Sequence, residues 1–177
     1  MSAPFLLLIS ARSFLIAALI IATAAHAAES TWRTRVDGIG PVRVGMTRAE
    51  AERAAGLPLS DDRELASAYC YYLDFTRGIK GVIFMMTESR IARVDVLVPG
   101  YATVSGAQIG DTEERLREIY GARATIEPHK YLGTAGHYIT VRSGNGRYAV
   151  QFETRHGRVI RYRAGRFPEV ALAEGCN

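Results

Sequence analysis

The sequence predicts an α+β protein in which one helix-plus-antiparallel-sheet unit occurs twice and packs as one compact domain. Three observations predict this class. A short glycine-threonine motif recurs along the chain, a helical pattern follows each copy, and runs of alternating apolar and polar residues follow each helix. A sheet with one apolar face needs a cover on that face only, so we expect one helix over each of two sheets.

The repeat is visible by self-comparison. Val44-Gly45-Met46-Thr47 corresponds to Ile109-Gly110-Asp111-Thr112, an offset of 65 residues (110 − 45). The same offset carries further residues onto one another: Gly56 onto Gly121, Gly81 onto Gly146, Glu88 onto Glu153, Arg90 onto Arg155, and Arg93 onto Arg158. The predicted units are residues 38–100 and 101–166.

Each predicted helix has start and stop signals. Thr47 and Glu50 make a capping box, and Asp111 with Glu114 predicts a second one a position earlier in the repeat. A glycine at the left-handed position is expected just after each helix. The second helix has an apolar face at helical spacing, made by Leu116, Ile119 and Tyr120.

The strands are predicted from period-two alternation and from turn residues. The predicted strands are residues 69–75, 82–86, 91–98, 137–141, 148–153 and 159–163. Asn145-Gly146 predicts a hairpin between two of them. In the last strand, Ile160 and Tyr162 are expected to face the core and Arg161 and Arg163 the open side of the sheet.

The N-terminus predicts export. Arg12 precedes an apolar run, and Ala25-His26-Ala27 gives a cleavage site, so residues 1–27 read as a signal peptide and 28–37 as an N-terminal segment. The apolar run is too short for an anchor, so the mature protein is expected in the periplasm or secreted and not membrane-spanning. Removing Arg12 changes the net charge from +4 to +3, which is too weakly basic for a nucleic-acid partner.

The two cysteines predict a disulfide. Cys70 and Cys176 are the only pair in an exported chain, so we expect them to be bonded and to fix a C-terminal tail, residues 167–177. Cys70 alternates with the apolar residues of its strand. The tail is therefore expected to cross the outer side of the sheet rather than enter the core.

The motif Gly45-Met46-Thr47, with its capped helix and Gly56, resembles the SmpA/OmlA family of envelope proteins, and Gly110, Thr112 and Gly121 repeat it. The tandem arrangement is similar to that of the beta-lactamase inhibitor protein family. The chain differs in having Asp111 at the Met position and no lipid-bearing cysteine at its cleavage site. The resemblance implies a non-enzymatic binding fold.

Catalytic and cofactor patterns are weak in this sequence. It has no Gly-x-Ser-x-Gly elbow and no phosphate-binding glycine loop, and no histidine pair has metal-ligand spacing, so no cofactor or metal is expected. One alternative is an enzyme in which folding gathers His129, Tyr131 and His137. Glu88 and Glu153 could be the paired carboxylates of a glycosidase. Residues at equivalent positions of the repeat are, however, expected on separate sheets, each paired with an arginine.

The last strand offers the best candidate surface. It is rich in arginine, with Arg155, Arg158, Arg161, Arg163 and Arg166 in a dozen residues. Such a face suits carboxylates or phosphates, so an acidic protein or an anionic envelope component is the expected partner. The sequence therefore favours an exported binding module, of inhibitor or assembly-accessory type. A small-ligand or lipid-binding protein, motivated by nine tyrosines, is the alternative.

Overall fold

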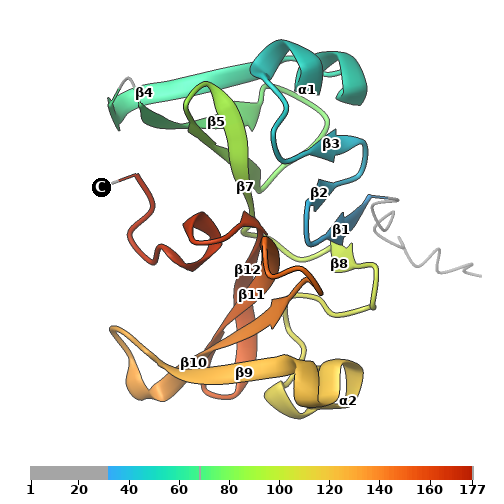
Figure 1. The fold of residues 1–177 in the computed structure, drawn as a ribbon, viewed down its shortest axis with the longest axis vertical. Coiled ribbons are helices and arrows are strands. Elements are labelled where there is room, and N and C mark those ends of the chain that lie inside the picture. The colour runs from blue at the N-terminus through green and yellow to red at the C-terminus, as the bar shows by residue number, and fades with distance from the viewer. Residues whose placement is uncertain (1–31, 68, 177) are drawn as a thin grey trace, which may run out of the picture.

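The computed structural model describes residues 32–67 and 69–176, so the predicted signal peptide lies outside the described residues. The fold is α+β, with two sheets and two short α-helices (Figure 1). No helix within the described residues is long and apolar enough to cross a membrane.

A continuous eight-stranded antiparallel sheet, the long sheet, runs through the molecule. The sequence predicts one sheet in each unit, but strands of the two units pair at the centre, with Tyr162 opposite Val96 and Ala164 opposite Val94. From edge to edge the strands are β4 (Leu59–Ser67), β5 (Cys70–Phe75), β6 (Val82–Thr87), β7 (Arg90–Val96), β12 (Arg158–Arg166), β11 (Tyr148–Arg155), β10 (Gly133–Arg142) and β9 (Ala124–His129). The central pair therefore joins two four-stranded halves in which the chain runs inward from each edge.

A four-stranded small sheet lies beside the long one (Figure 1). It consists of β3 (Val42–Arg43), β2 (Gly38–Ile39), β1 (Arg33–Arg35) and β8 (Ala102–Thr103). The segment before the first helix thus pairs with the segment before the second, with Arg33 opposite Ala102 in parallel. These short strands, together with β4 and β9, were not predicted from the sequence.

The first helix, α1 (Arg48–Ala55), has the predicted ends. Thr47 and Glu50 form the capping box, and Gly56 has the left-handed conformation with φ 66°. The second helix, α2 (Glu113–Tyr120), differs: its N-cap is Thr112, whose hydroxyl accepts from the amide of Arg115. The predicted Asp111–Glu114 box is therefore wrong.

Two more details of the second helix differ from prediction. Asp111 accepts from the amide of Gln108 in the preceding turn. Gly121 has ψ −136° and begins a short 3-10 turn, η1 (Gly121–Arg123), instead of closing the helix in the left-handed region.

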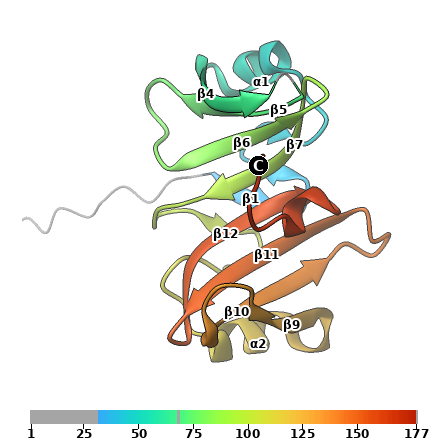
Figure 2. The same ribbon diagram turned by 90° about the vertical axis from the view of Figure 1, so that its left-hand side faces the viewer.

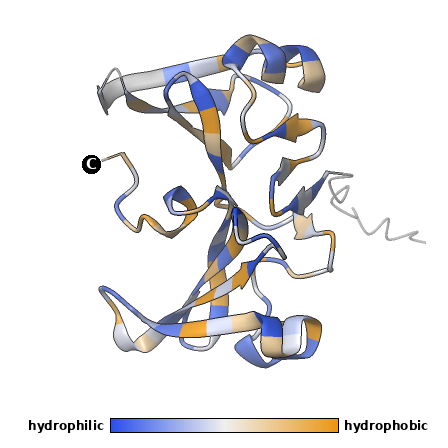
Figure 3. Cartoon of the chain, in the orientation of Figure 1, coloured by the Kyte–Doolittle hydropathy of each residue, from blue (hydrophilic) through white to orange (hydrophobic). Residues whose placement is uncertain are grey.

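The core lies between the long sheet and the layer made by the helices and the small sheet. Leu116 of α2 and Ala51 of α1 are fully buried there. Aromatic pairs fill it in both halves, Phe75 with Phe84 at 5.4 Å and Phe152 with Tyr162 at 5.5 Å between ring centroids. The core is one cluster that includes residues of both halves. Along the strands and helices, hydrophobic and hydrophilic residues are interspersed, as one-sided burial requires (Figure 3).

The two glycine-threonine segments make the same contacts. Gly45 donates to the carbonyl of Ile91 (2.7 Å), and Gly110 donates to the carbonyl of Val159 (2.9 Å). The return bonds also match, from Ile91 to Met46 and from Val159 to Asp111. The hydrogen bonds therefore relate Ile91 to Val159, an offset of 68 residues (159 − 91), while the glycines keep the offset of 65.

The arginines next to these residues obey the same correspondence. Arg90 donates to the carbonyl of Gly45 (2.7 Å) and Arg158 to the carbonyl of Gly110 (3.0 Å). Both follow tight turns whose first residues, Glu88 and His156, have φ of 52° and 50°. Arg158 thus has the place of Arg90, and the sequence pairing of Arg93 with Arg158 does not hold.

The C-terminal segment, residues 167–176, crosses the face of the long sheet opposite the helices, which we call the open face (Figures 1 and 2). It includes a cis Phe167–Pro168 peptide and a 3-10 turn, η2 (Glu169–Ala171). Its end is bonded to β5 through the Cys70–Cys176 disulfide. The predicted disulfide is confirmed, and the segment crosses the outer side of the sheet as predicted.

Candidate functional site

The five arginines of the candidate basic face do not form one surface. Arg155 and Arg158 are exposed beside the β11–β12 turn, and Arg161 is half-exposed. Arg166 binds the carboxylate of Glu169. The fifth, Arg163, is only 5% exposed. The expectation that it stands on an open surface is wrong, because the C-terminal segment covers it.

A β-bulge in β12 explains why Ile160 is less buried than predicted. Glu153 lies opposite Arg161 and Thr154 opposite Val159, so Ile160 is the extra residue between them. Ile160 is therefore only half-buried. Tyr162 faces the core as predicted, where burial raises the pKa of its hydroxyl far above the usual range.

Arg93 of β7 is one of the groups that hold the C-terminal segment. One guanidinium nitrogen, Nη1, donates to the carbonyls of Glu169 (3.0 Å) and Leu172 (2.9 Å). Its Nε donates to Asp95 (2.8 Å) and its Nη2 to the hydroxyl of Tyr72 (2.9 Å). These groups from two strands thus form a polar platform that satisfies the backbone carbonyls of the segment.

Arg93 and Asp95 were not predicted from the sequence to be part of this site. Their alternation with Val94 and Val96 does place them on the open face. That they are buried follows only from the C-terminal segment, whose path the alternation does not give.

Glu153 is the centre of a second buried cluster on the open face. It receives two bonds from Arg161 (2.7 and 2.8 Å) and one from His129 Nε2 (2.8 Å), and Arg163 Nη2 lies 3.6 Å away. Burial raises the pKa of Glu153, but the bonds from Arg161 and His129 outweigh it, so the pKa is lowered. Glu153 is therefore a buried carboxylate that stays ionised.

His129 has both ring nitrogens engaged. Nδ1 accepts from the amides of Tyr131 (3.0 Å) and Leu132 (3.2 Å), so the ring proton lies on Nε2 and points to Glu153. The ring also stacks on Tyr138 at 4.5 Å between centroids. No ring nitrogen is left to accept a proton from a substrate while these bonds hold.

His137 belongs to a different cluster. Its Nδ1 contacts Glu113 of α2 (2.9 Å), and the hydroxyl of Thr154 donates to the same carboxylate oxygen (2.6 Å). Burial raises the pKa of Glu113, but these two bonds lower it overall. Thr154 and Glu153 are consecutive in β11, so their side chains point to opposite faces of the sheet. The structure therefore does not bring His129 and His137 together.

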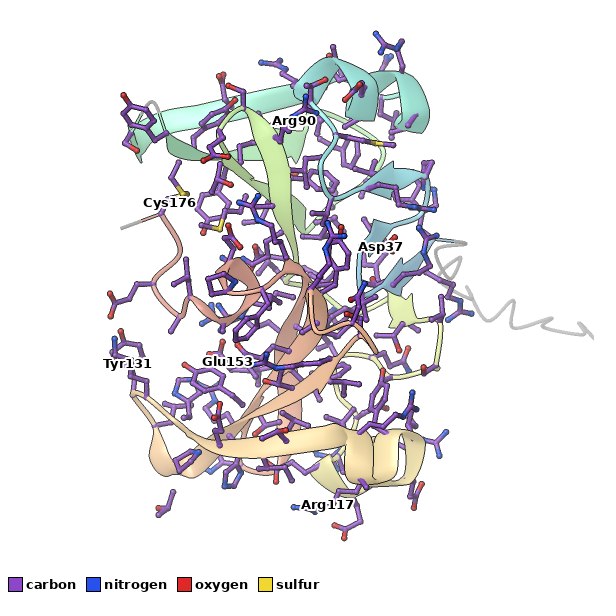
Figure 4. All side chains as sticks on the ribbon, viewed as in Figure 1. Asp37, Arg90, Arg117, Tyr131, Glu153 and Cys176 are labelled. Atoms are coloured by element: carbon purple, nitrogen blue, oxygen red, sulfur yellow. A yellow bond between two sulfur atoms is a disulfide. The ribbon has the colours of Figure 1, made fainter. Side chains whose placement is uncertain are left out.

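The two glutamates of the glycosidase hypothesis, Glu88 and Glu153, also lie in different environments. Glu153 is buried within β11, whereas Glu88 is exposed in the β6–β7 turn. In Figure 4, Glu153 and Tyr131 lie on the side of the C-terminal segment, and Asp37 lies on the side of the small sheet. Within residues 32–67 and 69–176, no three His, Cys, Asp or Glu side chains are grouped as a metal site.

Two of the hollows in the described part of the chain adjoin the sheets. A cleft of about 840 Å³ lies between the small sheet and the second half; Tyr120, Arg35, Val104 and Val141 are among the residues that line it. A smaller cavity of about 250 Å³ lies under the C-terminal segment, between residues 173–175 and the strands β5, β6, β7 and β12.

Exposed apolar side chains gather around the C-terminal segment. Leu97 lines the smaller cavity, Leu172 belongs to the segment, and the hydroxyl of Tyr131 bonds to Glu174. Tyr131 is 59% exposed and Leu172 43%. We call Leu97, Tyr131 and Leu172 the tail-side patch.

Comparison with known proteins adds one likeness. No protein-family model matches the chain, and no curated protein matches its sequence. Among solved structures, the chain is similar to the crystal structure of the uncharacterized protein YfeY from Escherichia coli. The identity is 12% and the TM-score 0.48, with 76% of this chain and 99% of that chain covered.

Proposed function

We propose that this protein is an exported, non-enzymatic binding module of the cell envelope that recognises a protein partner through the open face of its long sheet. The proposal includes periplasmic or secreted location, two tandem units at residues 38–100 and 101–166, and kinship with the SmpA/OmlA and beta-lactamase inhibitor protein families. The paired hydrogen bonds of Gly45 and Gly110 support the tandem units. The disulfide supports an oxidising compartment.

The observation that carries the proposal is the tail-side patch. Large exposed apolar side chains that gather on one face mark interaction surfaces more than singly scattered ones do. Tyrosine is also enriched in protein interfaces because it adds contact area at little entropic cost. Because the Cys70–Cys176 disulfide bonds the end of the C-terminal segment to β5, the position of this patch is fixed.

The proposed partner is an acidic protein or an anionic envelope component. Arg163 is buried, and Arg161 is paired with Glu153. The supporting charges are those of the exposed Arg155 and Arg158, together with the net charge of the mature chain. These charges would steer an acidic partner more than they would anchor it.

The non-enzymatic part rests on how the histidines are used. His129 is enclosed between Glu153 and two backbone amides. His137 has Glu113 beside it, but the nearby hydroxyl of Thr154 is fully buried and donates to Glu113 and to the backbone carbonyl of His137 rather than to the histidine ring. A nucleophile activated by a base requires a bond between those two groups.

Site-specific photo-crosslinking tests the proposal. A photoreactive amino acid replaces Tyr131 or Leu172 on the open face, or Arg117 on α2 as the control, in cells that produce the protein. We expect one adduct of defined mass from both open-face positions and none from Arg117. Adducts from Arg117 alone, or none from any position, would contradict the proposal.

A second candidate, small-ligand binding, is favoured by the cleft beside the small sheet. Its volume of about 840 Å³ lies within the roughly 300–1,000 Å³ typical of ligand sites. Its lining combines Val104 and Val141 with the Tyr120 ring and the Arg35 side chain. Native mass spectrometry of protein purified from its own host tests this: a bound small molecule that Val104→Trp abolishes would favour it, and a ligand-free mass would count against it.

A further inference from the structure

The cleft beside the small sheet has an apolar floor. Val141 of β10 and Val150 of β11 line it as cross-strand neighbours, and they are 5% and 4% exposed. The buried hydroxyls of Tyr120 and Thr103, which also line the cleft, bond to each other at 2.9 Å. The floor therefore presents apolar surface and hydroxyls that already have partners.

The rim of the cleft carries more positive than negative charge. Arg35, Arg123 and Arg142 line the cleft, whereas Asp37 is the one carboxylate among the described residues that line it. Arg35 donates to Asp37 (3.0 Å), so these two charges compensate each other. The guanidinium of Arg142 stacks at 3.6 Å on the ring of Phe167, which belongs to the C-terminal segment on the open face. Arg123 is therefore the cation that has no counter-charge in the cleft lining.

Arg123 is exposed and lies beside an aromatic ring of the floor. Its guanidinium is 5.7 Å from the centre of the Tyr120 ring and donates to the carbonyl of Ile119 (3.5 Å). Neither contact neutralises its charge, and no carboxylate of the described residues bonds to it. Burial raises the pKa of the Tyr120 hydroxyl, so this side chain stays uncharged at neutral pH. One positive charge thus lies at the edge of an apolar floor.

The rim also exposes an apolar side chain. Val104, directly after β8, is 64% exposed, and the half-buried Val36 lines the same cleft. An apolar molecule lying in the cleft would remove Val104 from water, and the gain from such burial is roughly proportional to the apolar area covered. The rim therefore favours a ligand with an apolar body as well as a negative charge.

We propose that this cleft binds an amphiphile with one oxyanionic head group, with the head group on Arg123 and the apolar body on the floor. A guanidinium matches the geometry of carboxylate and phosphate oxygens. The volume of about 840 Å³ suits a molecule of drug size rather than a free ion. The proposal rests on the second candidate function, small-ligand binding, and names the chemical class of that ligand.

Calorimetry on the mature protein tests the proposal with probes that share one alkyl chain: decanoate, decyl phosphate, decanol and decylamine. We expect at least one of the two anions to bind about fivefold more tightly than decanol, which is the upper value of an exposed ion pair. Decylamine should bind more weakly than decanol, because Arg123 repels its ammonium group. Added sodium chloride should reduce both differences, since salt screens exposed charges.

Three variants locate the binding. Arg123→Gln should abolish the preference for the anions over decanol. Arg155→Gln, which removes an exposed arginine that does not line the cleft, is the matched control and should keep that preference. Val104→Trp, which places a large ring at the rim, should weaken the binding of all probes. Circular dichroism that matches the wild type shows that each variant is folded.

Each outcome decides the proposal. A higher affinity for decanoate than for decyl phosphate identifies a carboxylate head group, and the reverse order identifies a phosphate. If decanol binds as tightly as both anions, or if Arg123→Gln keeps the preference, the proposal is wrong while small-ligand binding in the cleft stands. If no probe binds, or if Val104→Trp leaves all affinities unchanged, the proposal and the second candidate function both fail. The photo-crosslinking experiment then still tests the open face, which these variants do not alter.

Discussion

The two halves of the long sheet share a frame and differ in what they place on the open face. Gly45 with Arg90 and Gly110 with Arg158 tie each half to its inner hairpin in the same way. On the open face, the first half carries Arg93 with Asp95, whereas the second carries Glu153. The glycines and the turn geometry thus fix how each half packs, whereas the side chains of the open face can differ between the halves.

The C-terminal segment is the element that ties the halves together. It leaves β12 of the second half, covers both central strands and ends at Cys70 of the first half. Arg93 and Arg163, one from each half, donate to the same carbonyl of Leu172. The open face is therefore organised around the segment more than around the two units.

The largest expected effect comes from removing the disulfide. In Cys70→Ser/Cys176→Ser, we expect the free energy of unfolding to fall by about 4–5 kcal/mol, since the bridge closes a loop of about 100 residues. Urea denaturation of the variant and of the wild type with and without reductant measures it. If the loss is under about 1 kcal/mol, the polar contacts alone hold the segment.

The next effect comes from Glu153. In Glu153→Gln, we expect a loss of about 3 kcal/mol, because one carboxylate neutralises a buried arginine cluster and accepts from His129. Glu118→Gln, in an exposed pair with Arg115, is the control and should change stability by less than about 1 kcal/mol. Equal effects of both substitutions in denaturant titrations would show that the cluster is well solvated.

Acid is expected to weaken the second half through Glu113 and Glu153. The pKa of each is lower in the folded protein, so their stabilisation is present above the unfolded pKa and is lost as pH falls through the folded value. Thermal unfolding from pH 7 to pH 3 should show a smaller decline for Glu113→Gln/Glu153→Gln than for the wild type. Parallel curves would contradict the direction of these shifts. Glu50 also has a lowered pKa, but it is exposed, so its contribution is screened.

The sequence predicted the helices and longer strands better than it predicted the candidate site. The capping box at Thr47, the hairpin at Asn145-Gly146 and the six predicted strands all lie where local patterns placed them. The short strands of the small sheet are two or three residues long, too short for alternation to reveal them. Their pairing depends on residues far apart in the chain.

Arg163, whose face was predicted correctly and whose exposure was not, shows why the site was harder to predict. Alternation put Arg163 on the open face, and this is where it lies, but alternation does not say what covers that face. The bond between Cys70 and Cys176 located the end of the covering segment without giving its path. The pairing of His129 with Glu153 depends in turn on strands β9 and β11 flanking β10, which no local pattern specifies.

The smallest expected effect separates the two possible alignments of the halves. If Arg158 corresponds to Arg90, as their bonds to Gly110 and Gly45 indicate, Arg90→Ala and Arg158→Ala should each cost about 1 kcal/mol, the value of one exposed hydrogen bond. If Arg158 instead corresponded to Arg93, its loss would match Arg93→Ala, which removes a buried ion pair and two bonds to the C-terminal segment at about 3–5 kcal/mol. Urea denaturation of the three variants decides this, because the two expectations differ by more than the error of the method. A cost for Arg158→Ala near that of Arg93→Ala would undo the correspondence between the halves.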